Sequence, residues 1–178
     1  QLPCRWTPDA TFEYGQPTFN FYAQLVYAQG EILRLFGLSV IDTIKWLFIL
    51  SLVFSALSMY LLAKKVWKDQ LAAVVAAVFY IYAPYRAVDV YVRGALTEAW
   101  GFVWFPLILY WFEDYLETKR WRSWWLMGLC LAALIVTHNL STLMFAVVVG
   151  WWMLYRIYLF NAWKLVPKLL AVALVAFG

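Results

Sequence analysis

WLFILSLVFSALSMYLLA, residues 46–63, is a run of 18 residues without a single charge. A helix needs roughly 20 predominantly apolar residues to cross the hydrocarbon core of a bilayer. The run therefore predicts a membrane-spanning helix, which we extend to about residues 40–63. Ser51, Ser55 and Ser58 place small side chains along one side of it, which indicates close packing against a neighbouring helix.

The composition of the whole chain agrees with a membrane protein. The 178 residues are 66% hydrophobic, 21% aromatic and 13% charged, and the mean hydropathy is +0.72. These values are not those of a soluble domain. The net charge of +4 comes from short basic clusters between apolar runs, which is a topology signal and not a nucleic-acid-binding stripe. Cys4 and Cys130 make no disulfide framework. We predict an all-α, polytopic transmembrane bundle.

The N-terminal part, residues 1–39, is predicted to be an outer loop followed by an interfacial helix. Residues 1–18 hold three prolines and Gly15, which is typical of an irregular loop. Residues 19–36 predict a helix lying in the membrane interface; the alternative is a span whose polar stripe faces other helices. That stripe consists of Asn20, Gln24, Tyr27, Glu31 and Arg34. Gly37 is a helix stop, and Ser39 with Asp42 resembles a capping box.

Residues 40–178 are predicted to hold the membrane helices of the same single domain, residues 1–178. After the first span come apolar runs at 71–85, where Pro84 should bend or end the helix, and at 95–112, with a charged connection at 113–122. Residues 124–155 suit two short spans joined at His138. Together these make about five to six membrane helices plus the interfacial one. We expect truncation at both ends, because Gln1 is not an initiator residue and the chain stops within an apolar run at Gly178.

The distribution of basic residues predicts the orientation. Nine of the 14 lysines and arginines fall in three connections, which we place in the cytoplasm. They are Lys64, Lys65, Lys68, Lys119, Arg120, Arg122, Arg156, Lys164 and Lys168. The N-terminal loop, residues 82–98 and the His138 turn then share the outer face.

Residues 82–98, YAPYRAVDVYVRGALTE, form the most promising polar site. On a helix, Arg86, Asp89 and Arg93 follow each other at i, i+3 and i+7, so Asp89 could pair with either arginine. Charges between apolar runs in a membrane protein need a reason. One reading is a guanidinium pair that binds a phosphate or pyrophosphate; the other is an ion-pair network that fixes helix ends. Glu98, a turn into an apolar run, is either paired with Arg93 or functional.

His138 and Asn139 form a second candidate site. A histidine near neutral pH can act as a base, a proton donor or a phosphate contact, and a hydrogen-bonded turn residue is the competing interpretation. The side chains of the protein are not predicted to bind a metal ion by themselves, because there is no second histidine and no thiolate pair. Carboxylates together with a ligand phosphate could hold a magnesium or manganese ion.

Four motifs follow one another along the chain: P-x-R-W-x-P-D (3–9), Y-G-x-P-x-F-N-F-Y (14–22), Y-R-A-V-D-V-Y-V-R-G-A-L-x-E (85–98) and T-H-N-L (137–140). In this order they resemble one family of multi-pass membrane proteins, the 6-pyruvoyl-tetrahydropterin-synthase-related proteins, which in turn are similar to C-type glycosyltransferases. The resemblance implies a helical membrane enzyme that uses a polyprenyl-phosphate sugar donor at the outer face. It also implies a catalytic carboxylate just after the first membrane helix, upstream of Gln1; Asp9, Glu98 and His138 are the weaker candidates within the chain.

The resulting expectation is an integral protein of a prokaryotic cell membrane that transfers a sugar from a polyprenyl phosphate. Arg86, Asp89, Arg93, His138 and Asn139 are the expected substrate-binding residues. A non-catalytic membrane subunit that packs against other proteins is the first alternative; it predicts that the charged face is buried against another polypeptide. A transporter or flippase of lipid-linked intermediates is the second, and it predicts polar residues through the full membrane depth.

Overall fold

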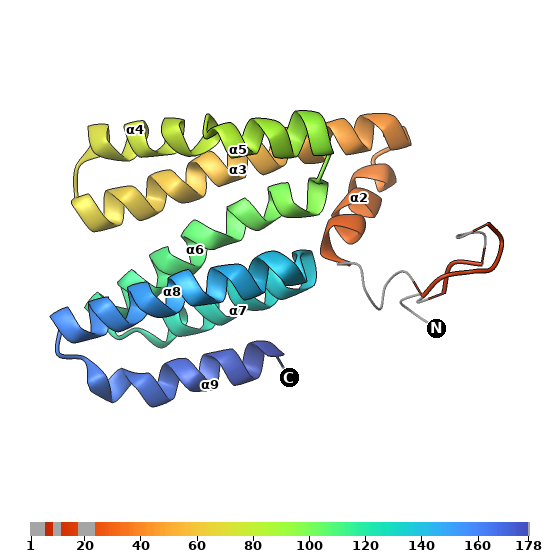
Figure 1. The fold of residues 1–178 in the computed structure, drawn as a ribbon. Coiled ribbons are helices and arrows are strands. Elements are labelled where there is room, and N and C mark those ends of the chain that lie inside the picture. Colours follow the sequence, from red (N-terminus) through yellow and green to blue (C-terminus); the bar gives the residue numbers. More distant parts are fainter. Residues whose placement is uncertain (1–5, 9–11, 18–23, 178) are drawn as a thin grey trace.

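The computed structural model describes residues 6–8, 12–17 and 24–177 (Figure 1). Within these ranges every regular element is helical, and the extended pairing is a single bridge between Thr7 and Gln16. The elements are α2 (Leu25–Leu35), α3 (Val40–Trp67), α4 (Gln70–Ile81), α5 (Pro84–Ala87), the π-helix η1 (Val88–Arg93), α6 (Leu96–Thr118), α7 (Trp121–Thr137), α8 (Asn139–Leu159), the 3₁₀ helix η2 (Trp163–Leu165) and α9 (Val166–Phe177). The predicted all-α class is confirmed.

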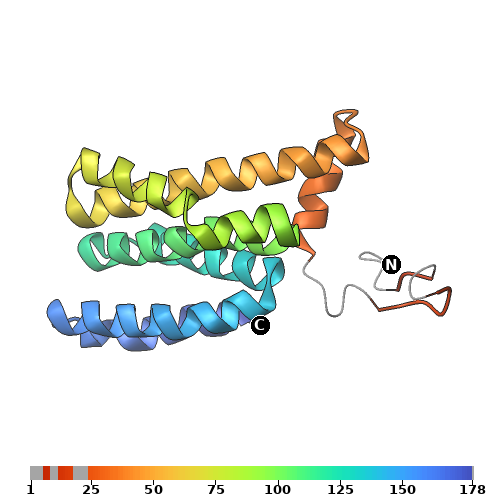
Figure 2. The same ribbon diagram turned by 45° about the horizontal axis from the view of Figure 1, so that its top comes forward.

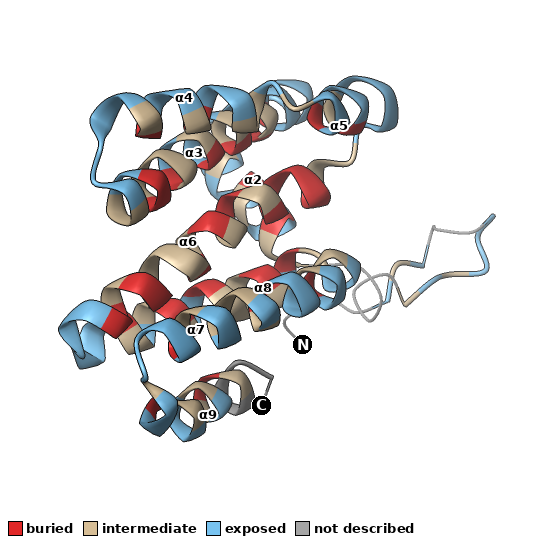
Figure 3. Cartoon of the chain, turned by 60° about the vertical axis from the view of Figure 1, so that its left-hand side comes forward, coloured by how far each residue is buried: buried red, intermediate tan, exposed pale blue. Residues whose placement is uncertain are grey.

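The long helices run back and forth in approximately aligned layers. Figures 1 and 2 show α3 with α4 on one side of the bundle, α6 in the middle, and α7, α8 and α9 beyond it. α6 is central because it packs against both α3 and α7. Twelve of its 23 residues are buried, whereas α8 presents mostly exposed residues in Figure 3 and α4 buries only Ala73 and Ala77.

Two helices, α3 and α8, are long and apolar enough to cross a membrane by length and composition. α4 and the α5–η1 segment would make a third candidate span if they are counted as one unit, which is bent by 43° at the break between them. α7 is apolar but has 17 residues. The structure is thus all-helical and consistent with a membrane protein, with two to three candidate spans where five to six were predicted.

Local chemistry explains where the helices begin and end. The Ser39 side chain accepts a hydrogen bond from the Asp42 amide at 3.1 Å, which is the predicted cap of α3. Gly37 adopts φ +86° after the end of α2. Pro84 is the first residue of α5, and α4 ends three residues before it. The predicted bend at this proline is confirmed.

Two predicted boundaries need correction. The charged connection at residues 113–122 is mostly helix, because α6 continues to Thr118. The acidic residues Glu113, Asp114 and Glu117 lie on the last turns of α6, where Lys65 of α3 and Arg156 of α8 neutralise them. These charges therefore do not end the helix. The predicted interfacial helix is α2, whose 11 residues rise only about 16 Å; this favours the interfacial position over a span. The beginning of that prediction, up to residue 23, lies outside the described residues.

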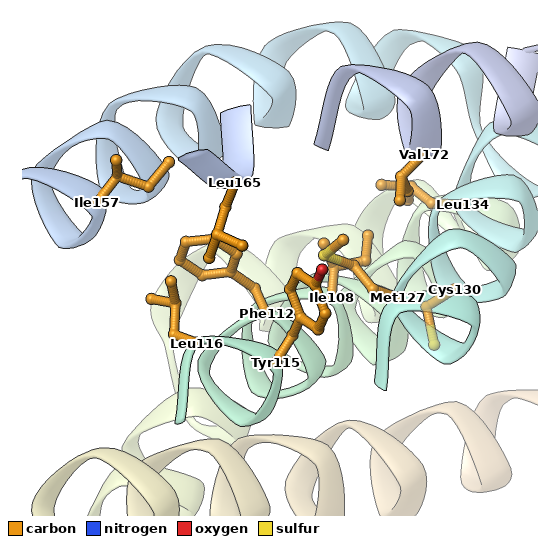
Figure 4. Close-up of a cluster of buried hydrophobic side chains, with 10 residues drawn as sticks. All are labelled: Ile108, Phe112, Tyr115, Leu116, Met127, Cys130, Leu134, Ile157, Leu165 and Val172. Atoms are coloured by element: carbon orange, nitrogen blue, oxygen red, sulfur yellow. The ribbon is translucent and has the colours of Figure 1, made fainter. Parts of the chain in front are cut away.

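Small and apolar side chains hold the layers together. Ser51, Ser55 and Ser58 are at most 2% exposed, and α3 packs against both α4 and α6, so the predicted close packing is confirmed. A hydrophobic core joins α6, α7 and α9, with Ile157 of α8 and Leu165 of η2 at its edge (Figure 4). Its centre includes Phe112 and Leu134, both fully buried.

The two ends of the bundle differ in charge. The α3–α4, α6–α7 and α8–α9 connections lie at one end in Figures 1 and 2, and the nine basic residues of the predicted cytoplasmic connections lie in or beside them. We call it the basic end. The η1–α6 connection and the α7–α8 turn lie together at the opposite end, as the basic residues predict.

Candidate functional site

Four polar side chains form a compact cluster where η1 meets α6. The Nη1 atom of Arg93 lies 3.3 Å from Oδ1 of Asp89 and 3.0 Å from Oε2 of Glu98, and it donates to the Tyr85 hydroxyl at 3.0 Å. The Tyr85 hydroxyl in turn donates to Oε1 of Glu98. We refer to Tyr85, Asp89, Arg93 and Glu98 as the Arg93 cluster.

The backbone brings these residues together over a short connection. Gly94 adopts a left-handed conformation with φ +59°, which glycine tolerates without strain. The carbonyl of Asp89 accepts a hydrogen bond from the Ala95 amide at 3.0 Å. α6 then begins at Leu96, so Glu98 lies in its first turn, where a carboxylate is favoured by the positive end of the helix dipole.

The side chains of the two carboxylates are more deeply buried than that of Arg93. The side chain of Asp89 is fully buried and that of Glu98 is 12% exposed, whereas that of Arg93 is 49% exposed. All three contacts of Arg93 with described residues use Nη1. Its Nε and Nη2 donors are therefore left for an external acceptor, and an oxyanion such as a phosphate is the ligand that a guanidinium fork holds best.

Arg86 has a different environment from Arg93. It is 2% exposed, and its guanidinium lies over the rings of Phe102 and Tyr80, at 4.6 and 5.5 Å from their centroids. None of its three side-chain nitrogens has a hydrogen-bond partner among the described residues, and the same holds for Oδ2 of Asp89.

Of the two arginines predicted as partners of Asp89, Arg93 forms the ion pair. Asp89 and Arg93 both lie in η1, whereas Arg86 lies in α5 and its guanidinium packs over the rings of Phe102 and Tyr80. The two arginines consequently do not form a guanidinium pair on one exposed face.

His138 caps a helix. Its Nδ1 accepts a hydrogen bond from the Ser141 amide at 3.2 Å and lies 2.7 Å from the Ser141 hydroxyl oxygen, at the start of α8. Among the described residues, it forms no hydrogen bond or ion pair with the Arg93 cluster. Asn139 is exposed and borders a separate cavity of about 330 Å³. Asp9 lies outside the described residues.

Two cavities lie between α2, α3 and α6. One, of about 400 Å³, is bordered by Gly94–Thr97 and by the charged residues Glu31 and Arg34 of α2. The other, of about 470 Å³, is an apolar groove further along α3 and α6. Gln29 and Trp100 line this groove, and the buried atoms Oε1 of Gln29 and Nε1 of Trp100 have no hydrogen-bond partner among the described residues.

The sequence did not predict two ion-pair groups at the basic end. Glu113 binds Arg156 and accepts a hydrogen bond from Nε1 of Trp152 at 3.0 Å. Lys65 binds Asp114 at 2.7 Å and Glu117 at 2.9 Å. The signal in the sequence was the presence of carboxylates at the end of an apolar run. Their basic partners in the ion pairs are more than 40 residues away in the chain.

In the described part of the chain, no three or more His, Cys, Asp and Glu side chains gather as a metal site would need. Asp89 and Glu98, the carboxylates nearest to a candidate phosphate, are both engaged by Arg93. Comparison with models of protein families, with curated proteins and with solved structures gives no match.

Proposed function

We propose that this chain belongs to a membrane protein that binds a polyprenyl-phosphate-linked sugar, and that it acts as a C-type glycosyltransferase-like protein at the outer face of the membrane. In this proposal all of the long helices, five to six in number, cross or enter the bilayer. Arg93 contacts the phosphate, and the catalytic group is not assigned.

The observation that carries the proposal is the geometry of Arg93. Its guanidinium is half-exposed and fixed through Nη1, while Nε and Nη2 make no hydrogen bond to the described residues. A phosphate can therefore bind without displacing Asp89 or Glu98. Because both carboxylates stay in place, the guanidinium keeps its orientation when the charge of the ligand changes during transfer.

The apolar groove supports the lipid part of the proposal. It lies between α2, α3 and α6, and its apolar walls suit an isoprenoid chain. The second cavity lies between this groove and the η1–α6 connection, since Leu47 borders both cavities and Gly94 borders the second. A lipid chain and its phosphate would then occupy neighbouring parts of one continuous surface.

The test is binding of radiolabelled decaprenyl phosphate to the detergent-solubilised protein, with decaprenol as the ligand without phosphate. A charge-assisted hydrogen bond contributes about 1.5–3 kcal/mol, so Arg93→Ala is expected to weaken binding of the phosphate roughly 10- to 100-fold. Arg93→Lys should recover only part of it, because lysine lacks the fork. Binding of decaprenol should change little in both variants.

Lys45→Ala is the matched control. Lys45 is an exposed cation at the same end of the bundle, 3.7 Å from Asp42, and its loss removes the same charge. Thermal unfolding of each variant establishes that it is folded. If folded Arg93→Ala binds decaprenyl phosphate as tightly as the wild type, the proposed function is wrong.

A further inference from the structure

The basic end carries cations that lack an acidic partner. Lys65 and Arg156 are neutralised there by carboxylates. By contrast, Lys119 and Arg120 in the α6–α7 connection, and Lys168 in the first turn of α9, form no ion pair with any described residue. Their charges are therefore available to a ligand.

The segments that carry two of these cations, Lys119 and Lys168, contact each other although 49 positions separate the two residues in the chain. Nε1 of Trp124, in the first turn of α7, donates to the carbonyl of Lys168 at 3.0 Å. α7 and α9 pack closely along their length: a Cβ built on Gly128 would lie 3.5 Å from Val172. Partial burial, and then the charge of Lys168, lower the pKa of Lys119, as expected for two ammonium groups without a carboxylate between them.

Several tryptophans lie near these lysines in the chain, at the start of α7 and in η2. Trp121, Trp124 and Trp125 contact one another with ring centroids 5.0 to 6.3 Å apart. Trp121 is 71% exposed and Trp163, just before Lys164, is 52% exposed. Tryptophan is favoured at the level of the lipid headgroups, where its ring is apolar and its N–H group is polar.

We propose that Lys119, Arg120 and Lys168, with Trp121 beside them, bind the headgroup phosphate of an anionic phospholipid from the surrounding bilayer. Basic pockets between membrane helices bind anionic headgroups, and each lysine or arginine near the surface adds to the attraction. The lipid neutralises two lysines that otherwise repel each other, and it links the start of α7 to the start of α9. This site is at the opposite end from the Arg93 cluster and does not depend on the proposed function.

The experiment titrates the detergent-solubilised full chain with dioctanoyl phosphatidylglycerol, and in parallel with dioctanoyl phosphatidylcholine and with inorganic phosphate. Thermal unfolding reports stabilisation by bound lipid, and native mass spectrometry counts the bound molecules. Phosphatidylglycerol should raise the Tm, whereas phosphatidylcholine and inorganic phosphate at the same concentration should not. The double variant Lys119→Gln/Lys168→Gln should weaken binding roughly 10- to 30-fold.

Lys64→Gln/Lys68→Gln is the matched control, because it removes the same charge from the α3–α4 connection at the same end. It should retain most of the affinity, and Lys119→Arg/Lys168→Arg should retain nearly all of it. Equal weakening in the two Gln double variants would show general electrostatic attraction and overturn the site. Equal stabilisation by phosphatidylcholine or by inorganic phosphate would overturn the choice of ligand.

Discussion

Arg156 in α8 binds both carboxylate oxygens of Glu113 in α6, at 2.6 Å from Nη2 to Oε2 and 2.8 Å from Nε to Oε1. Glu113 is 2% exposed. A buried pair of this kind is costly to break, because the remaining charge loses its partner. Together with the hydrogen bond from Nε1 of Trp152 to Glu113, it connects α6 to α8.

Arg156→Met is therefore expected to lower the free energy of unfolding by about 3–5 kcal/mol. The double variant Glu113→Leu/Arg156→Met removes both charges and should recover most of the loss. Reversible unfolding in mixed micelles measures both. A control is Lys45→Met, which breaks an exposed pair and should cost at most about 1 kcal/mol. A small loss in Arg156→Met would show that the buried pair contributes little.

The same substitution at Arg86 should have the opposite effect. Arg86 is as deeply buried as Glu113, but its guanidinium has ring contacts and no hydrogen-bond partner among the described residues. Its cation–π contacts contribute about 1–2 kcal/mol, which is less than the several kcal/mol needed to bury an unpaired charge. Arg86→Met should thus raise the free energy of unfolding by about 1–2 kcal/mol.

Parallel unfolding curves of Arg86→Met and Arg156→Met provide the comparison, since both variants exchange a buried arginine for the same side chain. An equal loss in both would mean that Arg86 has a stabilising partner. A gain in stability together with weaker binding of decaprenyl phosphate would identify Arg86 as a residue kept for function at the expense of stability.

His138 can be assigned to helix capping or to chemistry by two substitutions. His138→Ala removes the acceptor for the Ser141 amide and should cost about 1 kcal/mol. Asparagine is a good N-cap residue, so His138→Asn should restore stability. If His138 only caps α8, His138→Asn also retains binding of decaprenyl phosphate. Loss of binding in stable His138→Asn would support the ligand-contact interpretation.

Ser55 tests the packing of α3. It is fully buried, and its hydroxyl donates to the Leu52 carbonyl of its own helix, at 2.9 Å. Ser55→Leu should cost about 1–3 kcal/mol through overpacking, whereas Ser55→Ala should remain within about 1 kcal/mol of the wild type. Val53→Leu, at a 54% exposed position of the same helix, is the size control. Tolerance of Ser55→Leu would contradict the tight contact.

Local patterns in the sequence predicted most of the helices and several of their ends. The Ser39 cap, the Gly37 stop and the break at Pro84 depend on neighbouring residues alone, and each is where the local pattern placed it. The serine stripe of α3 was also readable, because its period matches that of a helix. These features need no knowledge of which helices pack together.

The site was harder to predict because it depends on two features without a local signature. A π-helix at Val88–Arg93 interrupts the α-helical spacing from which the partners of Asp89 were counted, and that spacing left two candidates. The pairing of Glu113 with Arg156 depends on how α6 and α8 pack. Sequence showed that these residues are charged in apolar surroundings, but only the packing shows which charges are neutralised.

The three oxygen contacts of Nη1 in Arg93 have a consequence for affinity. An arginine side chain loses about 2 kcal/mol of conformational freedom when it is fixed in one rotamer, and a flexible surface arginine would lose it on meeting its ligand. Here Tyr85, Asp89 and Glu98 already restrict the guanidinium before any ligand arrives. The free energy of each new hydrogen bond to Nε or Nη2 can then appear almost entirely as affinity, since the site is preorganised.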